Sequence, residues 1–464
     1  MTNPGYALVG VGLQYGDEGK VKIFDKISGI EDIGMFARFN GGSNAGHTLE
    51  LGGKRIATHA VPGGIAHPHM QLYVGSGCVL NPIKIVSELH DIKDFGFDLE
   101  GRLHIAGAVP LVQPSHMLLD GATGGKVGTT GNGIGPAYAD VAYRNLGSNL
   151  RNIRLIDYVK DHKESRSHVK KNAQQVAKTY GIDCPIDELV QEFDAAVSAI
   201  TPFLEENPLY ALNQIESGCN IFFEGANAVL LDVLTGTVPF VTSSRTIAQN
   251  AFVGGDVPLR YHKKTVGVAK AIMSRVGNGP FVSEFGGNAS EAYCAFDGGL
   301  KYGKEVEQRL YNPSKMLESC DPLAMAIGLR MLGNEYGATT KRPRRIGALD
   351  LVQLKQSARL NGIDELFLTK VDCLSDFNKT RLEGIPVVTA YKLDGKTIDF
   401  MPQTSNELRR SKPVVAYLPH IDQAVENGEL TPKAKYFVSE VEKYVGIPIK
   451  GVGIGPDRED FLWL

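Results

Sequence analysis

The first 140 residues alternate short apolar runs with glycine-rich loops. The runs have the length of buried strands, and a helical pattern begins at 83–89, between two of them. Strands that alternate with helices are typical of βα units, in which the strands run parallel. This part of the chain therefore predicts a mostly parallel sheet, with strands at 6–12, 34–39, 72–77 and 102–107.

The pattern changes between residues 150 and 218, where the chain becomes charged and follows a helical period over 158–180 and 186–204. We predict a helical excursion at 150–218. Strand-like apolar runs then return at 220–223, 265–271, 365–369, 386–391 and 413–418. With no internal repeat and no long linker, the whole chain, 1–464, is predicted to be one α/β domain. Its large central sheet is expected to be flanked by helices, with helical and small β excursions.

Composition indicates an ordinary soluble enzyme. The 49 Lys and Arg residues nearly balance the 52 Asp and Glu residues, giving a net charge of −3, so no global field favours nucleic acid or a membrane surface. The N-terminus lacks the features of a signal peptide, and no apolar run reaches the length of a membrane span. The cysteines stand singly, which indicates a reduced, cytoplasmic protein: Cys78, Cys184, Cys219, Cys294, Cys320 and Cys373.

The segment Gly16–Lys20 (GDEGK) directly follows the first predicted strand. Its glycines let the backbone approach a phosphate, Lys20 adds positive charge, and Asp17 can hold Mg2+ or act as a base. It is not a Walker A loop, because that pattern needs a glycine where Gln14 stands and Ser or Thr where Val21 stands. The alternative is an acidic turn that caps a helix, with Lys22 and Asp25 on the solvated face of that helix.

Further along, small residues surround His47 in the segment NAGHT, so a ligand can reach an imidazole that exchanges protons near neutral pH. The alternative is a structural histidine, with Asn44 and Thr48 as turn formers. Asn227 follows a predicted strand, at the edge where α/β sheets bind ligands. Other hydroxyl-bearing segments are candidate phosphate cradles, or else a structural loop and a helix cap: Thr129 with Thr130, and Thr242 with Ser243 and Ser244.

Two later segments carry charge. Residues 339–345 (TTKRPRR) gather cations beside two threonines, which suits a carboxylate or phosphate clamp, although a solvated basic loop is the alternative. Lys370 and Asp372 follow an apolar strand. An Asp in that place can accept both N1–H and N2–H of guanine, while the lysine stem covers the ring.

Taken in order, these motifs closely resemble the adenylosuccinate synthetase family, GTP-dependent ligases that join L-aspartate to IMP. The resemblance extends from about residue 8 to residue 462 and includes GDEGK, NAGHT, GTTGNGIGPAY, EGAN, PFVTSS, GATTKRPRR, LTKVD and GPDR. It implies a fold related to the P-loop NTPases. It also implies that O6 of IMP is phosphorylated first and that the amine of aspartate then displaces the phosphate.

The resemblance assigns roles to individual residues. Asp17 would take the N1 proton of IMP and coordinate Mg2+, His47 would act as the acid, and the Gly46 carbonyl would be a further metal ligand. Lys20 would be the third catalytic residue, because it holds the phosphates during the transfer. GTP would contact Gly16, Glu18, Gly19, Lys20, Thr48, Arg344, Lys370, Asp372, Gly453 and Gly455. IMP would contact Asn44, Thr129, Thr130, Asn227, Thr242 and, across a homodimer interface, Arg144. Aspartate would contact Thr339, Thr340 and Arg342.

Some positions depart from the family pattern, and two other functions stay open. The departures are Val21, Ser43, Asn132, Arg245, Lys341 and Pro343, together with a long segment at 284–335, interpreted as an insertion. The same chemistry on another purine nucleotide, such as dGMP, is one alternative. It ranks lower because relatives that use dGMP replace the aspartate at position 17 by a small hydroxyl residue. A non-catalytic regulatory homologue is the other, and the joint presence of Asp17, Lys20, His47 and Arg342 argues against it.

Overall fold

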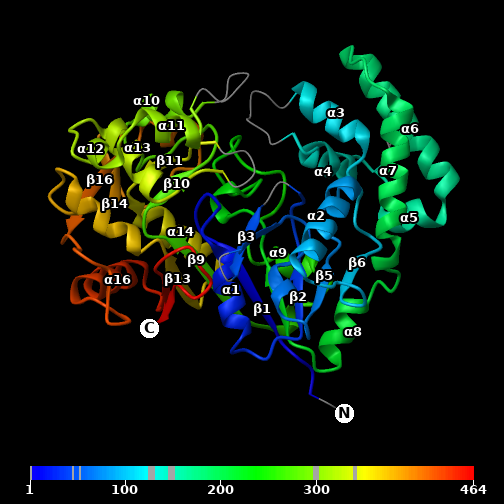
Figure 1. Ribbon diagram of the computed structural model, residues 1–464, viewed down its shortest axis with the longest axis horizontal. Coiled ribbons are helices and arrows are strands. Elements are labelled where there is room, and N and C mark those ends of the chain that lie inside the picture. Colours follow the sequence, from blue (N-terminus) through cyan, green and yellow to red (C-terminus); the bar gives the residue numbers. More distant parts are fainter. Residues whose placement is uncertain are drawn as a thin grey trace.

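The computed structural model describes residues 3–43, 46–51, 54–123, 131–144, 152–295, 302–337 and 342–464. Within these ranges, ten strands form the central sheet in the order β20-β19-β13-β9-β1-β8-β2-β5-β6-β7 (Figure 1). Every neighbouring pair is parallel except β19 and β20. The predicted sheet is thus confirmed. Its strands are β1 (Ala7–Gly12), β2 (Met35–Arg38), β5 (Gln71–Val74), β6 (Leu103–Ala106), β7 (Leu204–Glu205), β8 (Ile221–Glu224), β9 (His262–Lys270), β13 (Glu365–Thr369), β19 (Ile449–Gly453) and β20 (Phe461–Trp463).

Strand β1 lies in the middle of the sheet and is buried along its whole length. Strands covered on both faces are read in sequence as continuous apolar runs, which is why this segment is recognisable. A cluster of phenylalanines packs on one face, with the rings of Phe24 and Phe36 at 4.9 and 5.0 Å from that of Phe222. A side chain at Gly10 would meet Phe24 at 2.5 Å, so a glycine is needed here.

Helices flank the sheet on both sides (Figure 1). Helix α2 (Pro82–Phe95) begins and ends at residue types that favour helix termini. Asn81 caps its N-terminus by accepting from two backbone N–H groups, and Gly96 ends it at φ +106°. The other helices around the sheet are α1 (Lys20–Ser28), α8 (Tyr210–Glu216), α9 (Asn250–Gly254), α14 (Leu351–Asn361) and α16 (Pro432–Val445).

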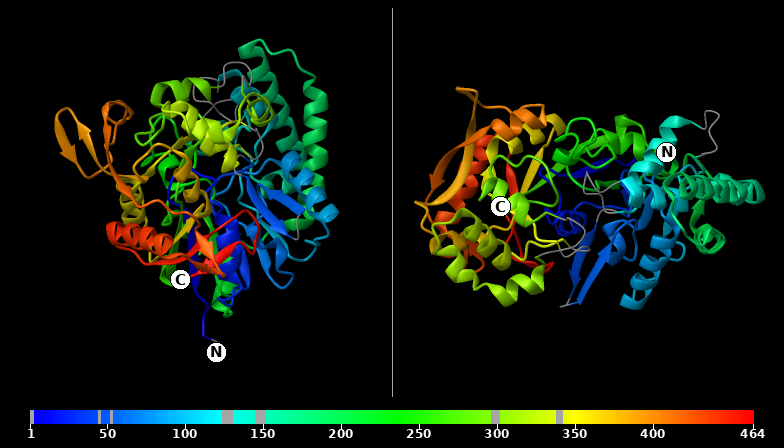
Figure 2. Two further views of the ribbon diagram at one scale, coloured as in Figure 1. Left: turned by 60° about the vertical axis from the view of Figure 1, so that its left-hand side comes forward. Right: turned by 90° about the horizontal axis from the view of Figure 1, so that it is seen from above.

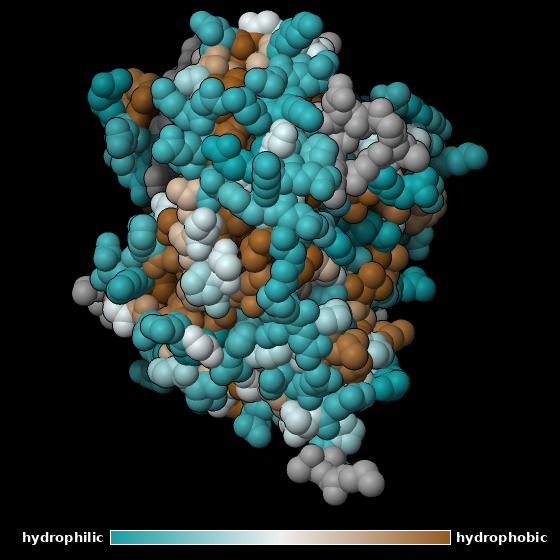
Figure 3. Space-filling view, turned by 90° about the vertical axis from the view of Figure 1, so that its right-hand side faces the viewer, coloured by the Kyte–Doolittle hydropathy of each residue, from teal (hydrophilic) through white to brown (hydrophobic). Residues whose placement is uncertain are grey.

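The predicted helical excursion consists of α5 (Leu155–Lys160), α6 (His162–Tyr180) and α7 (Ile186–Ile200), with a break at Asp161. It also carries β7, which adds a short strand at the edge of the sheet. Helix α6 packs on α3 (Pro114–Thr123), and α7 packs on α2. Figure 3 shows this side of the molecule, where hydrophilic side chains prevail and smaller hydrophobic areas lie between them.

The described residues of the segment 284–335 pack against the main body as helices α10 (Gly287–Tyr293), α11 (Lys304–Leu310), α12 (Pro313–Leu317) and α13 (Pro322–Leu332). Leu317 and Leu329 belong to the same hydrophobic core as the central sheet. Next to α13 runs a short antiparallel pair, β10 (Met273–Arg275) with β11 (Arg345–Gly347). Whether this segment is an insertion stays a prediction, but it is packed into the core.

The strand candidates 386–391 and 413–418 do not enter the central sheet. They form β14 (Ile385–Leu393) and β16 (Lys412–Leu418), which pair in a separate sheet with β12 (Leu349–Asp350) and β15 (Lys396–Ile398). Strand β16 is mostly exposed, so it lacks the covered faces of an inner parallel strand. This sheet projects at one end of the molecule (Figure 2). The remaining elements are α4 (Ile134–Tyr143), α15 (Ser405–Arg410), β17 (Val425–Glu426), β18 (Glu429–Leu430) and the hairpin of β3 (His47–Leu51) and β4 (Lys54–Thr58).

Among the described residues, no helix combines the length and the apolar character required to cross a bilayer.

Candidate active site

The loop between β1 and α1, residues 13–19, is called the glycine loop below, and several of its residues have unusual backbone conformations. Gly16, Asp17 and Gly19 all have positive φ, at 91°, 57° and 74°. Glycine takes this conformation freely, and aspartate tolerates it better than most residues. No side chain caps the following helix, α1. Its first N–H groups therefore face the loop, as they do where helix N-termini bind phosphate.

Glu18 shapes this loop from within. Its buried carboxylate accepts hydrogen bonds from Gln14 N at 3.2 Å, Gly16 N at 2.8 Å and Lys20 Nζ at 2.9 Å. Any side chain at Gly12 would collide with that carboxylate. The contacts of the Glu18 side chain thus lie within the protein, and a contact from this residue to a nucleotide would come from its backbone.

Helix α1 forms hydrogen bonds and an ion pair with residues 455–460, called the C-terminal segment below. Lys22 Nζ donates to the carbonyl oxygens of Gly455 at 2.6 Å and Asp460 at 3.1 Å. Asp25 pairs with Arg458 and with His67, whose Nε2 is 2.7 Å away. Both Lys22 and Asp25 are buried, and burial lowers the pKa of Lys22. The reading that these two residues lie on a solvated helix face is therefore wrong, because the C-terminal segment covers them.

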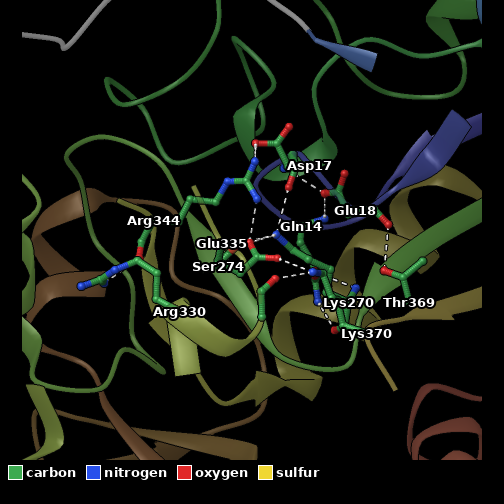
Figure 4. A network of polar contacts seen from close by, with 12 residues as sticks. Gln14, Asp17, Glu18, Lys270, Ser274, Arg330, Glu335, Arg344, Thr369 and Lys370 are labelled. Atoms are coloured by element: carbon green, nitrogen blue, oxygen red, sulfur yellow. Dashed lines mark hydrogen bonds and ion pairs between the residues drawn. The ribbon is translucent and has the colours of Figure 1, made fainter. Parts of the chain in front are cut away.

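A buried carboxylate, Glu335, lies at the centre of the polar network drawn in Figure 4. Arg344 Nη1 is 2.8 Å from it, Lys370 Nζ 3.3 Å and Lys270 Nζ 3.6 Å. Burial alone would raise the pKa of Glu335, but the three cations outweigh burial and hold this pKa well below the usual range. The opposite end of the Arg344 guanidinium reaches Asp17, with Nη2 2.6 Å from Oδ2.

Lys370 and Asp372 follow β13 at the carboxyl edge of the sheet. Lys370 has φ +63°, and its Nζ donates to the Gly333 carbonyl at 2.6 Å. Asp372 Oδ1 is buried and has no hydrogen-bond partner among the described residues. Buried polar atoms of this kind need a partner, and a bound ligand can supply it. The β13 end also meets the glycine loop, because Thr369 Oγ1 donates to the Glu18 carbonyl at 2.8 Å.

The predicted IMP residues lie at the ends of other elements. Asn227 follows β8 with φ +58°, and its Oδ1 is buried without a partner among the described residues. Thr242 is partly buried, and its backbone N–H donates to the Leu231 carbonyl. Arg144 ends α4 at φ +56° and is exposed. The structure thus gives each of these residues a defined local environment.

The remaining site predictions are placed in part or not at all. Arg342 is partly buried, and burial lowers its pKa. Gly453 ends β19, packed on Thr369, and Gly455 lies beside Asp460. The backbones of His47 and Thr48 pair with Thr58 and Ala57 in the hairpin, directly after Gly46. Outside the described residues lie Asn44, Thr129, Thr130, Thr339, Thr340 and Lys341.

Sequence reasoning missed Glu335, Lys270 and Ser274. Lys270 ends β9, so a charged residue near the end of the predicted strand 265–271 is a signal for the ligand-binding edge. Ser274 donates to Glu335 at 2.6 Å. Glu335 has no motif of its own and is identified only by its contacts.

The donor atoms available suit Mg2+. Within the described residues, no three His, Cys, Asp or Glu side chains cluster as a metal site. Mg2+ is usually held by one or two carboxylates together with phosphate oxygens and water, so such a cluster is not required. The Asp17 carboxylate and the Gly46 carbonyl are both hard oxygen donors, and the Asp17 side chain is 34% exposed beside the glycine loop.

A parallel sheet whose carboxyl edge carries a glycine loop, a Lys and Asp pair and buried arginines defines an α/β enzyme that acts on phosphorylated ligands. The family model for adenylosuccinate synthetase matches residues 9–462. The chain therefore belongs to the adenylosuccinate synthetase family.

Individual relatives agree over their full length. Adenylosuccinate synthetase 2 of Cupriavidus pinatubonensis is 41% identical over 461 residues, which are 98% of this chain and 97% of the relative. The adenylosuccinate synthetase of Myxococcus xanthus is 35% identical over 473 residues, 98% of each chain.

Two solved structures share the fold. The fully ligated adenylosuccinate synthetase of Plasmodium falciparum matches with a TM-score of 0.82 at 28% identity, covering 99% of this chain and all of that one. The succinoaminodeoxyadenylate synthetase of cyanophage S-2L, bound to dGMP and dATP, matches with a TM-score of 0.60 over 99% of this chain and 96% of that one. At 17% identity, this second likeness concerns the fold alone.

Proposed function

We propose that this chain forms adenylosuccinate in two chemical steps at the carboxyl edge of its central sheet. The overall reaction follows from the family: the chain is a GTP-dependent ligase that joins IMP to L-aspartate, in purine nucleotide biosynthesis. In the first step, O6 of IMP attacks the γ-phosphate of GTP, and GDP leaves. In the second step, the amine of aspartate attacks C6, and phosphate leaves.

Asp17 is the proposed base. By taking the N1 proton of IMP it raises the charge on O6, which makes that oxygen a better nucleophile. His47 is the proposed acid on the leaving side of the phosphoryl transfer. The exposure of the Asp17 carboxylate at the tip of the glycine loop supports this assignment, because a base must reach its substrate.

The same loop is proposed to hold the phosphates of GTP, through Gly16, Gly19, Lys20 and the backbone of Glu18, with Thr48 and Arg344 as further contacts. Phosphoryl transfer depends mainly on positioning and charge stabilisation, which these groups supply. Lys370 and Asp372 are proposed to read guanine beside the segment of Gly453 and Gly455. The unpartnered Oδ1 of Asp372 supports this role, since guanine offers N1–H and N2–H donors.

The other substrates are assigned by the family motifs. IMP is proposed to contact Asn44, Thr129, Thr130, Asn227 and Thr242, and aspartate is proposed to contact Thr339, Thr340 and Arg342. The buried, unpartnered Oδ1 of Asn227 at the edge of the sheet supports its assignment. The observation that carries the whole proposal is the junction at Thr369, where the strand leading to Lys370 and Asp372 bonds to the glycine loop.

Asp17 and the Gly46 carbonyl would hold Mg2+, which neutralises phosphate charge when bound. We further propose a homodimer in which Arg144 reaches the partner's IMP site. The exposure of Arg144 at the end of α4 supports this arrangement. All six cysteines are unpaired, which supports a cytoplasmic location.

The test compares acceptors. The purified chain is incubated with Mg-GTP, aspartate and either IMP or dGMP, and phosphate release is followed together with the ultraviolet change at the purine. We expect turnover with IMP. Turnover with dGMP but not with IMP would show that dGMP is the acceptor. If neither nucleotide leads to phosphate release, the chain is a non-catalytic regulatory homologue. The presence of Asp17 rather than a small hydroxyl residue favours IMP.

A further inference from the structure

Glu335 stands between α13 and β11, and no motif marks it. One carboxylate oxygen, Oε2, accepts from Ser274 Oγ at 2.6 Å and Arg344 Nη1 at 2.8 Å, with Lys270 Nζ at 3.6 Å. The other oxygen, Oε1, lies 3.3 Å from Lys370 Nζ. Both oxygens are therefore engaged, and they hold three cations that come from three separate elements (Figure 4).

Two of the cations held by Glu335 contact the glycine loop, and the third stands two residues before Asp372. Arg344 reaches Asp17 in the glycine loop. Lys270 donates to the carbonyl of Gly16 at 3.3 Å. Lys370 precedes Asp372, the proposed guanine reader. A change at this one carboxylate would therefore reach both the phosphate side and the guanine side of the site.

Because Glu335 and two of its cation partners are buried, the stability of this network depends on the balance of their charges. Glu335 is 6% exposed, Arg344 7% and Lys270 0%. In a buried setting, removal of one charge leaves its partners without compensation, and like charges then repel one another. Without the Glu335 charge, Arg344, Lys270 and Lys370 would lose the carboxylate that contacts all three of them.

We propose that Glu335 is a positioning residue of the ligase, which fixes Arg344 and Lys370 in the places where GTP binding requires them. This inference rests on the proposed function of the site. It also gives the segment 284–335 a role, because the backbone of Glu335 is anchored on both sides. Its N–H donates to the Arg330 carbonyl at 2.9 Å, and its carbonyl accepts from Arg344 N at 3.0 Å.

The first experiment measures nucleotide binding without turnover. Fluorescent N-methylanthraniloyl-GDP is titrated into the full chain and into Glu335→Gln and Glu335→Asp. Loss of a charge-assisted contact is expected to weaken binding about tenfold or more in Glu335→Gln. Glu335→Asp keeps the charge and is expected to bind more tightly than Glu335→Gln. In steady state, we expect KM for GTP to rise and kcat to fall while KM for IMP stays nearly unchanged.

A double-mutant cycle separates positioning from general damage. If Glu335 acts through Lys370, the variant Glu335→Gln/Lys370→Met is expected to bind the nucleotide no more weakly than the weaker single variant, since the effects are not additive. Glu291→Gln is the matched control. It alters a carboxylate of the same segment that pairs with Arg345 and Arg409 and contacts neither lysine. It is expected to keep normal nucleotide affinity.

Several results would overturn the inference: unchanged affinity in Glu335→Gln, fully additive effects with Lys370→Met, or an equal loss of affinity in Glu291→Gln. The binding measurements are independent of the reaction. A wild-type chain that binds the fluorescent nucleotide but does not turn over IMP would overturn the proposed function and leave the positioning role standing. Turnover of IMP together with fully additive effects of Glu335→Gln and Lys370→Met would overturn the positioning role and leave the proposed function standing.

Discussion

Arg344 donates to the carboxylate of Asp17, with Nη2 2.6 Å from Oδ2. The proposed base is therefore paired with a guanidinium that also bonds Glu335 through its other terminal nitrogen, at 2.8 Å. A base must present a free oxygen to the proton that it takes. The contact of Arg344 is with Oδ2, so Oδ1 is the oxygen assigned to the proton transfer, and the pair sets the orientation of the carboxylate before IMP arrives.

Removal of the proposed proton-handling groups should abolish turnover without unfolding the chain. We expect Asp17→Asn and His47→Asn each to lower kcat by at least about 10², the usual effect of losing a general acid or base. Phosphate release and the ultraviolet change at the purine measure kcat, and circular dichroism shows whether the variants are folded. Asp32→Asn, which makes the same change at an exposed turn, should keep full activity. Near-normal kcat in either active-site variant would remove that residue from its assigned role.

The proposed dimer predicts complementation between two defective subunits. Arg144→Leu is expected to raise the apparent KM for IMP, because it removes a cation from the partner's IMP site. When it is mixed with Asp17→Asn, each mixed dimer holds one intact site, so about a quarter of wild-type activity should return at equal mixing. Assays after co-refolding or subunit exchange measure this recovery. If the mixture shows no recovery, Arg144 does not act across an interface.

The sequence predicted the central sheet well because its strands are buried on both faces, as the run Ala7–Gly12 shows. It also located the glycine loop and the Lys370 and Asp372 pair, since both directly follow strands. The alternative that placed Lys22 and Asp25 on a solvated helix face is wrong, because the C-terminal segment that covers them is far away in the chain.

The Glu335 network was also beyond the reach of the sequence. Its members come from the end of β9, from the segment after α13 and from the end of β13, and no local pattern connects them. Only the order of the strands in the sheet places β9 beside β13, and this order brings Lys270 and Lys370 to the same carboxylate.

The segment 284–335 contains a buried ion pair whose loss should be costly. The guanidinium of Arg330 binds the carboxylate of Glu307, and both side chains are completely buried. Tyr336 OH donates to the same carboxylate at 2.6 Å. Glu307→Gln leaves the arginine charge buried and uncompensated, which is expected to destabilise the fold by about 3–5 kcal/mol.

Scanning calorimetry of the ligand-free protein would show this loss as a lower melting temperature. Lys160→Gln is the control, because it breaks a surface pair with Glu206 in which both side chains are more than half exposed. Such pairs contribute little, and the melting temperature should not change measurably. An equal melting temperature for Glu307→Gln and the wild type would contradict a stabilising role for the buried pair.

A pH-dependent contribution to stability is expected from Asp350, at the start of α14. Its completely buried carboxylate accepts from Gln353 N at 3.0 Å and from Tyr391 OH at 2.7 Å. Burial raises the pKa of Asp350 from 3.8 to about 6. Because this pKa is higher in the folded than in the unfolded chain, the folded state holds the proton more tightly. The resulting stabilisation is fully present below the unfolded pKa and is lost as the pH rises through the folded pKa.

The shift corresponds to about 3 kcal/mol between pH 4 and pH 7, at 1.36 kcal/mol for each pKa unit. Asp350→Asn cannot titrate, and its single amide oxygen keeps an acceptor for one of the two hydrogen bonds, so the cost of the lost acceptor does not itself change with pH. The stability of the wild type relative to this variant should therefore fall by up to about 3 kcal/mol as the pH rises over that range. Urea unfolding of both proteins at matched pH values measures the difference and cancels the contributions of all other groups. A difference that stays constant, or that grows with pH, would show that burial does not raise the pKa of Asp350.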